Sequence, residues 1–149
     1  MDKKVKEVMN KDVAKIESDK SVLDAARLMA DKGVGCVVIT SGIKALGIVT
    51  ERDLVSRVLV EPFDPSKVLV RDIATTPLFK ISPDQTVKEA AELMVKYKIR
   101  RLPVVDKDML IGIITANDLA AMIAGKTGDE DLILKAVTRS KRPPPGIYG

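Results

Sequence analysis

The sequence repeats itself once, and this internal duplication limits the possible folds more than any other feature. Shifting the chain by 65 residues aligns Val5–Leu54 with Val70–Leu119 without a gap, and 14 of the 50 aligned positions are identical. The identities include Ala25/Ala90, Met29/Met94, Gly47/Gly112 and Asp53/Asp118. A unit of about 55 residues buries too little surface to be stable alone, so the two copies are expected to pack against each other.

Each copy is expected to contain an extended piece, a helix, two strands and a second helix, in that order. Both first helices open with capping-box spacing, and the β-rich runs are joined by short polar turns. The extended pieces and strands are predicted at 13–16, 36–40 and 45–49, and at 78–81, 102–105 and 110–114; the second helices begin at Glu51 and Ala116. The sequence therefore predicts an α+β fold of two β-α-β-β-α repeats packed pseudo-symmetrically through their sheets.

Turn residues divide the chain into four segments. The stretch from Glu61 to Pro65 is turn-rich and typical of a linker, while Pro143–Pro145 cannot continue a helix. The predicted segments are a first repeat at 1–60, a linker at 61–69, a second repeat at 70–124 and a C-terminal segment at 125–149. In the last segment we expect a loop over 125–131, a short helix over 132–137 and a basic, proline-rich tail.

Composition argues against catalysis and against a metal site. The chain has no histidine, the commonest general base and metal ligand near neutral pH. Its single cysteine, Cys36, cannot form an internal disulfide or a four-ligand zinc site, and its apolar surroundings in the sequence predict a buried, unreactive thiol. No apolar run reaches the length of about 18 residues that a membrane span needs, and the N-terminus lacks a secretory apolar region. We therefore expect a cytoplasmic, non-enzymatic protein.

The net charge of +4 comes entirely from residues 135–149. Residues 1–134 contain 21 basic and 21 acidic side chains, and the excess is carried by Lys135, Arg139, Lys141 and Arg142. The two Phe and two Tyr residues are too few and too scattered for a base-stacking platform. Nucleic-acid binding is therefore disfavoured and confined to the tail, which otherwise serves as a solvated linker or docks on a protein partner.

One motif stands out in both copies, at the point where the last strand meets the second helix. It runs from Gly47 through Thr50 to Asp53 in the first copy, and Thr115 and Asp118 occupy the same places in the second. The Thr-x-x-Asp spacing is that of a capping box, which stability alone explains. The same arrangement also suits a sugar phosphate, because helix-start amides favour phosphate and a carboxylate can accept from two ribose hydroxyls. Spacing alone leaves both interpretations open.

These motifs, with the run from Ile99 to Asp106, resemble a tandem pair of CBS domains, the regulatory modules named after cystathionine β-synthase. The resemblance covers residues 5–123 and includes both copies in the same order. It implies two clefts that hold adenosine-containing regulatory ligands such as AMP, ADP, ATP or S-adenosylmethionine, with no further cofactor. It also implies a disc-like homodimer.

The resemblance implies a role for each matching residue. Asp53 and Asp118 would hold ribose hydroxyls, and Thr50 and Thr115 would lie near ribose or phosphate. Phosphate would face Arg101, helped by Arg100 and Arg52. The base would be enclosed by residues around Ala14, Ile16, Cys36, Val37, Phe79, Lys80, Ile81, Leu102 and Pro103. Because the first copy has Cys36 where the second has Arg101, we expect unequal affinities, with the cleft of Asp118 and Arg101 the better nucleotide site.

Three functions compete at this point. The first is a sensor that binds an adenine nucleotide between the repeats and signals to a partner or to its own oligomer. The second is a structural or protein-interaction module whose clefts stay empty, which the capping-box interpretation favours. The third is weak nucleic-acid binding through the basic tail.

Overall fold

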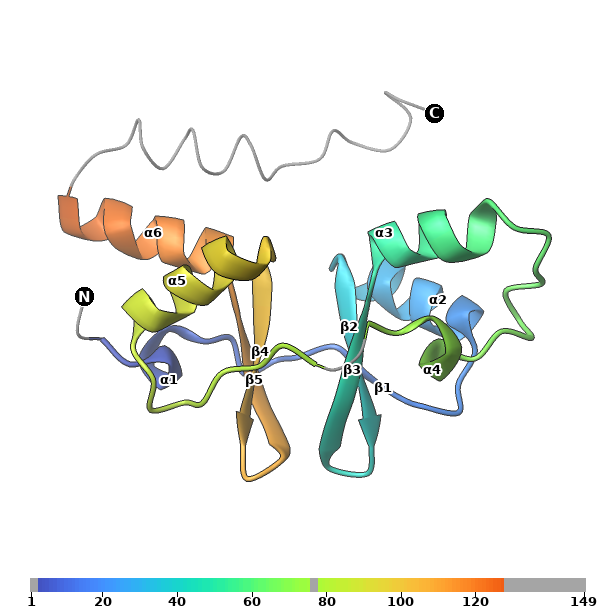
Figure 1. The fold of residues 1–149 in the computed structure, drawn as a ribbon, viewed down its shortest axis with the longest axis horizontal. Helices are drawn as coiled ribbons and strands as arrows, with labels where there is room; N and C mark the ends of the chain where they lie inside the picture. The colour runs from blue at the N-terminus through green and yellow to red at the C-terminus, as the bar shows by residue number, and fades with distance from the viewer. Residues whose placement is uncertain (1–2, 76–77, 128–149) are drawn as a thin grey trace.

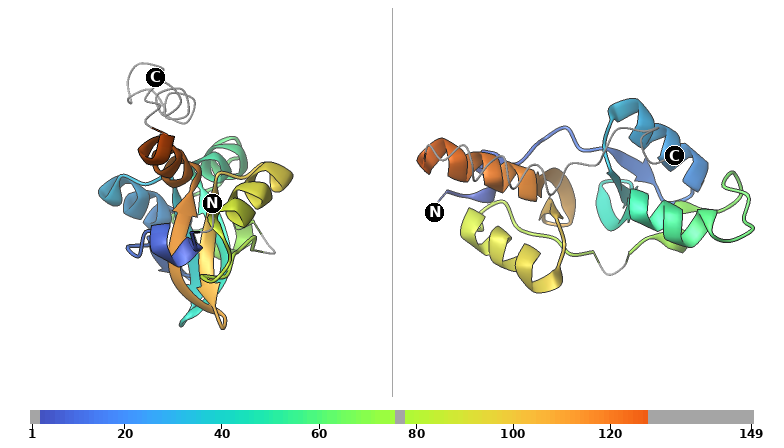
Figure 2. Two further views of the ribbon diagram at one scale, coloured as in Figure 1. Left: turned by 90° about the vertical axis from the view of Figure 1, so that its left-hand side faces the viewer. Right: turned by 90° about the horizontal axis from the view of Figure 1, so that it is seen from above.

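The computed structural model describes residues 3–75 and 78–127, and for 123–127 it describes only the helical backbone. Two similar halves stand side by side (Figure 1). The hairpins of the two halves meet in the middle, and the helices lie on the outer sides and along one end, as the two turned views also show (Figure 2). The pseudo-symmetric α+β architecture expected from the duplication is confirmed.

The first half contains all the expected elements, the second half lacks the expected first strand, and each half has one short helix more. The first half is built from β1 (Lys15–Glu17), α2 (Val22–Lys32), β2 (Cys36–Ser41), β3 (Lys44–Thr50) and α3 (Glu51–Leu54), which continues as a π-helical turn over Val55–Leu59. The second half is built from α5 (Val87–Tyr97), β4 (Arg101–Asp106), β5 (Met109–Thr115) and α6 (Ala116–Thr127). The additional single-turn helices are α1 (Val5–Val8) and α4 (Val70–Ile73).

The strands form one five-stranded sheet in the order β1-β2-β3-β5-β4. Within each half the two long strands are an antiparallel hairpin, and β1 runs parallel to β2. Among the described strands, the two hairpins pair with each other near their tips, where Lys44 pairs with Met109 and the amide of Ala45 donates to the carbonyl of Asp108 at 3.3 Å. Away from the tips the two hairpins diverge, and this divergence leaves room between the halves.

The strand expected over 78–81 is reduced to one parallel bridge, and two prolines explain the loss. In the first half the amides of Ser18 and Val38 donate the hydrogen bonds that flank β1, at 3.0 and 2.9 Å. The equivalent residues of the second half are Pro83 and Pro103, which carry no amide hydrogen. The two repeats therefore differ at the sheet edge although their patterns look alike.

The two single-turn helices are exchanged between the halves. Val5, in α1, is fully buried in the core of the second half, and its amide donates to the carbonyl of Gln85 at 2.8 Å. Val70, in α4, is fully buried in the core of the first half, where its amide donates to the carbonyl of Lys20 at 2.9 Å. Each repeat therefore supplies core residues to the other: Val5 in one direction, and Val70 with Ile73 in the other.

A close crossing of the chain makes this exchange possible. After α1 the chain passes over β5, where Asn10 and Ile113 exchange two backbone hydrogen bonds at 2.8 and 2.9 Å. A Cβ on Gly112 would lie 2.5 Å from the sulfur of Met9 and 3.1 Å from the carbonyl oxygen of Asn10. A side chain there would displace Met9 and press against the Asn10 carbonyl, so the glycine permits the close approach of the crossing segment.

The first helices begin as predicted, and the last one ends later than predicted. The hydroxyls of Ser21 and Thr86 accept hydrogen bonds from the amides of Asp24 and Glu89, both at 3.1 Å. The loop predicted from Gly125 is wrong for 125–127, which continue α6. The rest of that loop, the short helix over 132–137 and the tail lie outside the described residues. No described helix is long and apolar enough to cross a bilayer.

Candidate functional site

Two clefts open between the halves, one beside each Thr-x-x-Asp motif. The cleft beside Asp53 has a volume of about 450 Å³ and is called the Asp53 cleft. It is lined by Ile48, Thr50, Arg52, Asp53, Thr75, Phe79, Lys98, Ile99, Arg100, Arg101 and Pro103. The Asp118 cleft, of about 370 Å³, is lined by Asn10, Asp12, Val13, Ala14, Val34, Gly35, Cys36, Arg101, Ile113, Thr115, Asn117 and Asp118.

Each cleft combines the motif of one half with the segment that precedes the first hairpin strand of the other half. Arg100 and Pro103 therefore lie with Asp53, and Cys36 lies with Asp118. Arg101 lines both clefts and so lies with Asp118 as expected, whereas Arg52 and Arg100 line the Asp53 cleft. The halves face each other, so the end of one repeat's last strand lies opposite the start of the other repeat's first hairpin strand.

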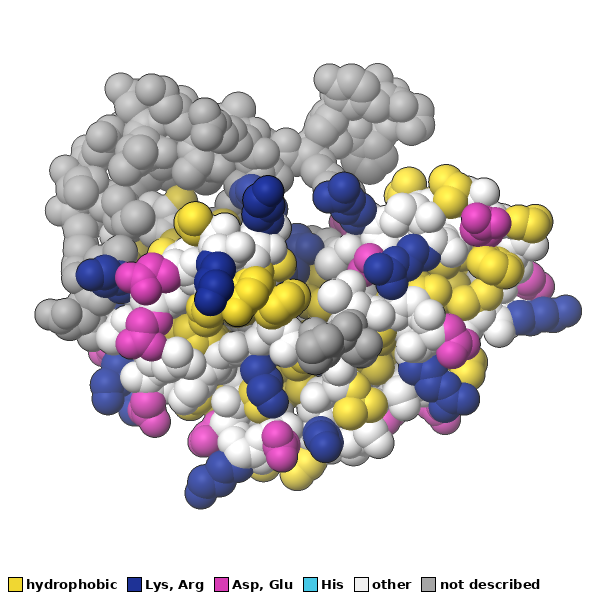
Figure 3. Space-filling model, viewed as in Figure 1, with side chains coloured by type: hydrophobic (Ala, Val, Ile, Leu, Met, Phe, Trp, Pro, Cys, Tyr) yellow, Lys and Arg dark blue, Asp and Glu magenta, His cyan; other side chains and the backbone are white. Residues whose placement is uncertain are grey.

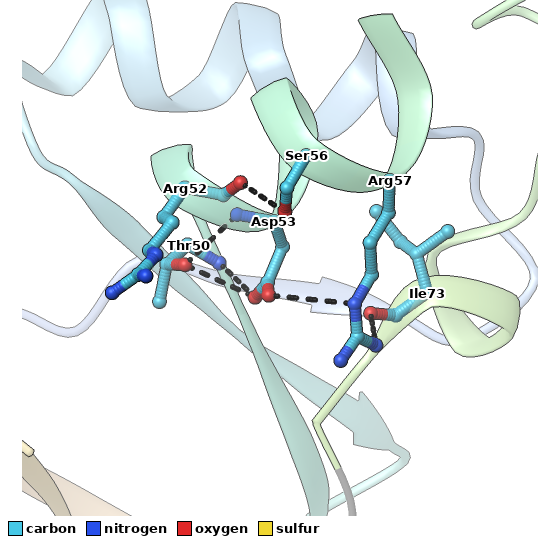
Figure 4. A network of polar contacts seen from close by, with 6 residues as sticks. All are labelled: Thr50, Arg52, Asp53, Ser56, Arg57 and Ile73. Atoms are coloured by element: carbon cyan, nitrogen blue, oxygen red, sulfur yellow. Dashed lines mark hydrogen bonds and ion pairs between the residues drawn. The ribbon is translucent and has the colours of Figure 1, made fainter. Parts of the chain in front are cut away.

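The first motif is a complete capping box and also part of a cleft. The Oδ2 atom of Asp53 accepts from the amide and the hydroxyl of Thr50, at 2.9 and 3.0 Å, and the Asp53 amide donates to the Thr50 hydroxyl at 3.2 Å (Figure 4). The Oδ1 atom lies 3.9 Å from Nε of Arg57, whose guanidinium also donates to the carbonyl of Ile73 at 2.9 Å. One carboxylate oxygen therefore holds the helix start, and the other lies toward Arg57.

The second motif repeats this geometry without the arginine. Oδ2 of Asp118 accepts from the amide and hydroxyl of Thr115 at 2.8 and 3.0 Å, and the Asp118 amide donates to that hydroxyl at 3.2 Å. The residue equivalent to Arg57 is Met122, which packs against the core of the second half. Both interpretations of the Thr-x-x-Asp spacing are therefore compatible, since capping uses only one of the two carboxylate oxygens.

The Asp53 cleft carries an aromatic pair at its edge. Phe79 lines the cleft and stacks on Tyr97, with 4.6 Å between ring centroids, and Nζ of Lys96 lies 5.3 Å from the Tyr97 centroid. The interpretation of the aromatic residues as scattered is therefore wrong for this pair, which lies 18 residues apart in sequence. In the Asp118 cleft the position of Phe79 is taken by Ala14.

Gly35 and Cys36 give the Asp118 cleft a different wall. An Nη atom of Arg101 and an Oε atom of Glu51 each lie 3.3 Å from the point that a Cβ on Gly35 would occupy. The glycine therefore lets the guanidinium reach across from the second half to the first. Burial raises the pKa of the Cys36 thiol, an effect that the charge of Arg101 opposes and that of Glu51 reinforces.

The raised pKa predicts that Cys36 reacts slowly with alkylating reagents. Because less thiolate is present at a given pH, we expect iodoacetamide to modify Cys36 at pH 8 at least about tenfold more slowly in the folded protein than in urea. Mass spectrometry of the alkylated chain over a pH series measures the rate, and the midpoint of the folded profile should lie above that of the unfolded control. A midpoint below the unfolded value would contradict the assignment.

Several residues expected around the base lie outside both clefts. Val37, Ile81 and Leu102 are buried in the two cores, and Ile16 packs against the core of the first half. Alternation along β2 and β4 turns Val37 and Leu102 to the helix side, while Cys36 and Arg101 face the clefts. The Nζ of Lys80 lies 3.8 Å from a carboxylate oxygen of Asp108 at a hairpin tip.

The clefts also contain residues that the sequence reasoning missed. Asn10 and Thr75 come from the crossing segments that follow α1 and α4, and Asp12 and Val13 follow Asn10. The other missed residues are Ile48, Lys98, Ile99, Val34, Ile113 and Asn117. Asn10/Thr75, Val34/Ile99 and Ile48/Ile113 are equivalent pairs under the 65-residue shift, so the repeat relation itself is the signal that links them.

Comparison with known proteins identifies the family. The CBS domain family model matches residues 5–60 and 70–125. The chain therefore belongs to the CBS domain family, and it is a pair of such domains. Among the described residues, no group of three or more Cys, Asp or Glu side chains is placed to hold a metal ion.

Some of the relatives are longer than this chain. An uncharacterized protein of Methanopyrus kandleri is 40% identical over 117 residues, which are 77% of this chain and 60% of that protein. The CBS domain-containing protein YhcV of Bacillus subtilis is 32% identical over 116 residues, covering 78% of this chain and 82% of YhcV. The chain thus spans about 60% of the length of the archaeal relative.

Among solved structures, the CBS domain pair of protein MJ0100 has the same fold. It superposes with a TM-score of 0.76 at 26% identity, covering 85% of this chain and all of that domain pair. That structure is a complex with 5′-methylthioadenosine and S-adenosyl-L-methionine.

Proposed function

We propose that this chain is a non-catalytic regulatory module that binds adenosine-containing ligands in its two clefts. The observation that carries the proposal is the composition of each cleft, which brings a helix-start Thr-x-x-Asp motif from one repeat against the hairpin start of the other. A ligand in such a cleft touches both halves at once. Its binding therefore favours one arrangement of the halves, which is the physical requirement for a sensor.

The chemistry of the Asp53 cleft suits an adenine nucleotide. Oδ1 of Asp53 is not used by the capping box, so it can accept from ribose hydroxyls. Phe79, Ile48 and Pro103 provide an apolar wall for the base, and four basic side chains surround the space for phosphate. This cleft, rather than the Asp118 cleft expected from the sequence, is proposed as the stronger nucleotide site.

The related pair from MJ0100 supports a ligand of this class, since its complex contains two adenosine derivatives. We propose that occupancy acts on a protein partner or on the chain's own homodimer, in the cytoplasm. A segment beyond residue 127 is the proposed docking element for a protein partner.

A thermal unfolding series tests the proposal. ATP, AMP and S-adenosylmethionine are added separately at up to millimolar concentration, and calorimetry then gives the stoichiometry. A ligand at 100 times its Kd stabilises the folded state by about 2.7 kcal/mol, which raises the Tm of a domain of this size by several degrees. At least one of the three is expected to do so.

The second candidate is a structural module with empty clefts. It is favoured by the complete capping boxes, because both aspartates already have a stabilising role. Unchanged Tm with all three ligands, together with no heat of binding, would establish this alternative and exclude the sensor.

A further inference from the structure

The two clefts differ strongly in charge. Among the residues that the structure describes, four basic and one acidic residue line the Asp53 cleft, whereas one basic and two acidic residues line the Asp118 cleft. In the space-filling view, Lys and Arg side chains gather around the hollow between the halves (Figure 3). Two clefts built from one repeated motif have therefore become electrostatically unlike.

The charge difference between the clefts arises because the two repeats have different residues at each basic position of the Asp53 cleft. Under the 65-residue shift, the four basic residues of the Asp53 cleft correspond to uncharged residues. The pairs are Arg52/Asn117, Lys98/Gly33, Arg100/Gly35 and Arg101/Cys36. Arg57, which lies 3.9 Å from the Asp53 carboxylate, corresponds to Met122. Of these uncharged equivalents, Gly35, Cys36 and Asn117 line the Asp118 cleft, where each stands in place of a positive charge.

The one basic residue that lines the Asp118 cleft within the described ranges is shared with the other cleft. Arg101 starts β4 at the centre of the molecule and lines both clefts. An anion in the Asp53 cleft therefore attracts the same guanidinium that an anion in the Asp118 cleft would need. Of the two acidic residues, Asp12 is partly balanced by Lys32, at 3.3 Å, so Asp118 carries most of the negative charge that faces the cleft.

We propose that the two clefts bind different classes of adenosyl ligand. The Asp53 cleft takes a nucleoside polyphosphate, and the Asp118 cleft takes an adenosyl compound without phosphate, uncharged or carrying a positive sulfonium. This inference rests on the proposed function and adds the ligand class of each cleft. A triphosphate needs several cations to offset the loss of its hydration, and in the described part of the chain these line the Asp53 cleft.

The same charges favour a sulfonium in the Asp118 cleft. Its carboxylates attract a positive centre, whereas they repel phosphate at close range. The side chains opposite the motif in this cleft are small, namely Ala14, Gly35 and Cys36. They leave space for a nucleoside but provide no charged group for a phosphate. Charge and side-chain size therefore point to the same division.

Native mass spectrometry with ATP and S-adenosylmethionine tests the division, with adenosine as the uncharged probe. The expected result is one tight ATP and one S-adenosylmethionine bound to each chain at the same time. ATP affinity should fall as NaCl is raised from 50 to 500 mM, while adenosine affinity should change little, because salt screens only the charged interaction.

A matched pair of variants assigns the clefts. Arg52 and Asn117 are equivalent and exposed, so exchanging their side chain types alters charge without touching either core. Arg52→Asn should weaken ATP roughly three- to tenfold and leave S-adenosylmethionine unchanged. Asn117→Arg should allow a second ATP to bind in the Asp118 cleft. The affinity of that cleft for ATP should rise roughly three- to tenfold over the wild type.

Two results would overturn the division. One is two equivalent ATP molecules bound to the wild-type chain; the other is displacement of S-adenosylmethionine by ATP in simple competition. Equal weakening of both ligands by Arg52→Asn would also contradict it. These outcomes differ from failure of the proposed function, in which neither ATP, S-adenosylmethionine nor adenosine binds to the wild type and the present inference falls with it.

Discussion

Replacing Asp53 by asparagine is expected to weaken ATP binding by about 10- to 100-fold. A hydrogen bond to a charged group contributes about 1.5–3 kcal/mol, and each 1.4 kcal/mol corresponds to tenfold in affinity. Asparagine keeps one oxygen that can accept from the Thr50 amide, so the helix start is retained while the charged acceptor for ribose is lost. Calorimetric titration with ATP measures the change.

The matched control is Asp118→Asn, which has the same position in the other repeat. It should leave the ATP affinity within about threefold of the wild type, since the carboxylate it removes faces the other cleft. Without ligand, both variants should unfold within about 3 °C of the wild type, because the caps remain. Equal ATP affinities in wild type and Asp53→Asn would remove Asp53 from the site.

Replacing Val5 by alanine is expected to lower the free energy of unfolding by about 2–3 kcal/mol. Val5 is fully buried in the core of the second half, and the change removes two methyl groups and leaves a cavity. The effect should appear far away in sequence. Relative to the wild type, native-state hydrogen exchange of the backbone amides should accelerate more in β4 and β5 than in β2 and β3.

Val70→Ala provides the mirror control. Val70 fills the equivalent place in the core of the first half, so its replacement should cost a similar free energy and should accelerate exchange in β2 and β3 instead. Urea unfolding measures the cost for both variants. The swapped positions of α1 and α4 would be contradicted by either of two results. One is the same pattern of hydrogen exchange in both variants, and the other is a loss of unfolding free energy below about 1 kcal/mol for Val5→Ala.

Periodicity and turn chemistry predict most of the fold because they act locally. The first helices, their caps and both hairpins follow from apolar spacing and from residues such as Ser21 and Thr86. Four-residue helices such as α1 and α4 are too short to show a period, so they were missed. Their exchange depends on a crossing over Gly112, which depends on contacts distant in sequence.

In the candidate site, too, local features are predictable from the sequence and contacts between distant segments are not. The Thr-x-x-Asp motif predicts both helix starts, and the duplication predicts that there are two such motifs. What the sequence cannot show is which hairpin start faces which aspartate, because this depends on how the halves are turned toward each other. The reach of Arg101 past Gly35 and the stacking of Phe79 on Tyr97 are likewise contacts between distant segments.

The exchanged helices carry a consequence for the isolated repeat. A fragment ending after residue 60 retains Val5 but has lost the core that receives it, and its own core has lost Val70. Because these two valines are equivalent, two copies of the fragment can each insert Val5 into the other and complete both. A single repeat is therefore expected to exist as an interlocked dimer, and joining two such subunits end to end would give a chain of the present kind.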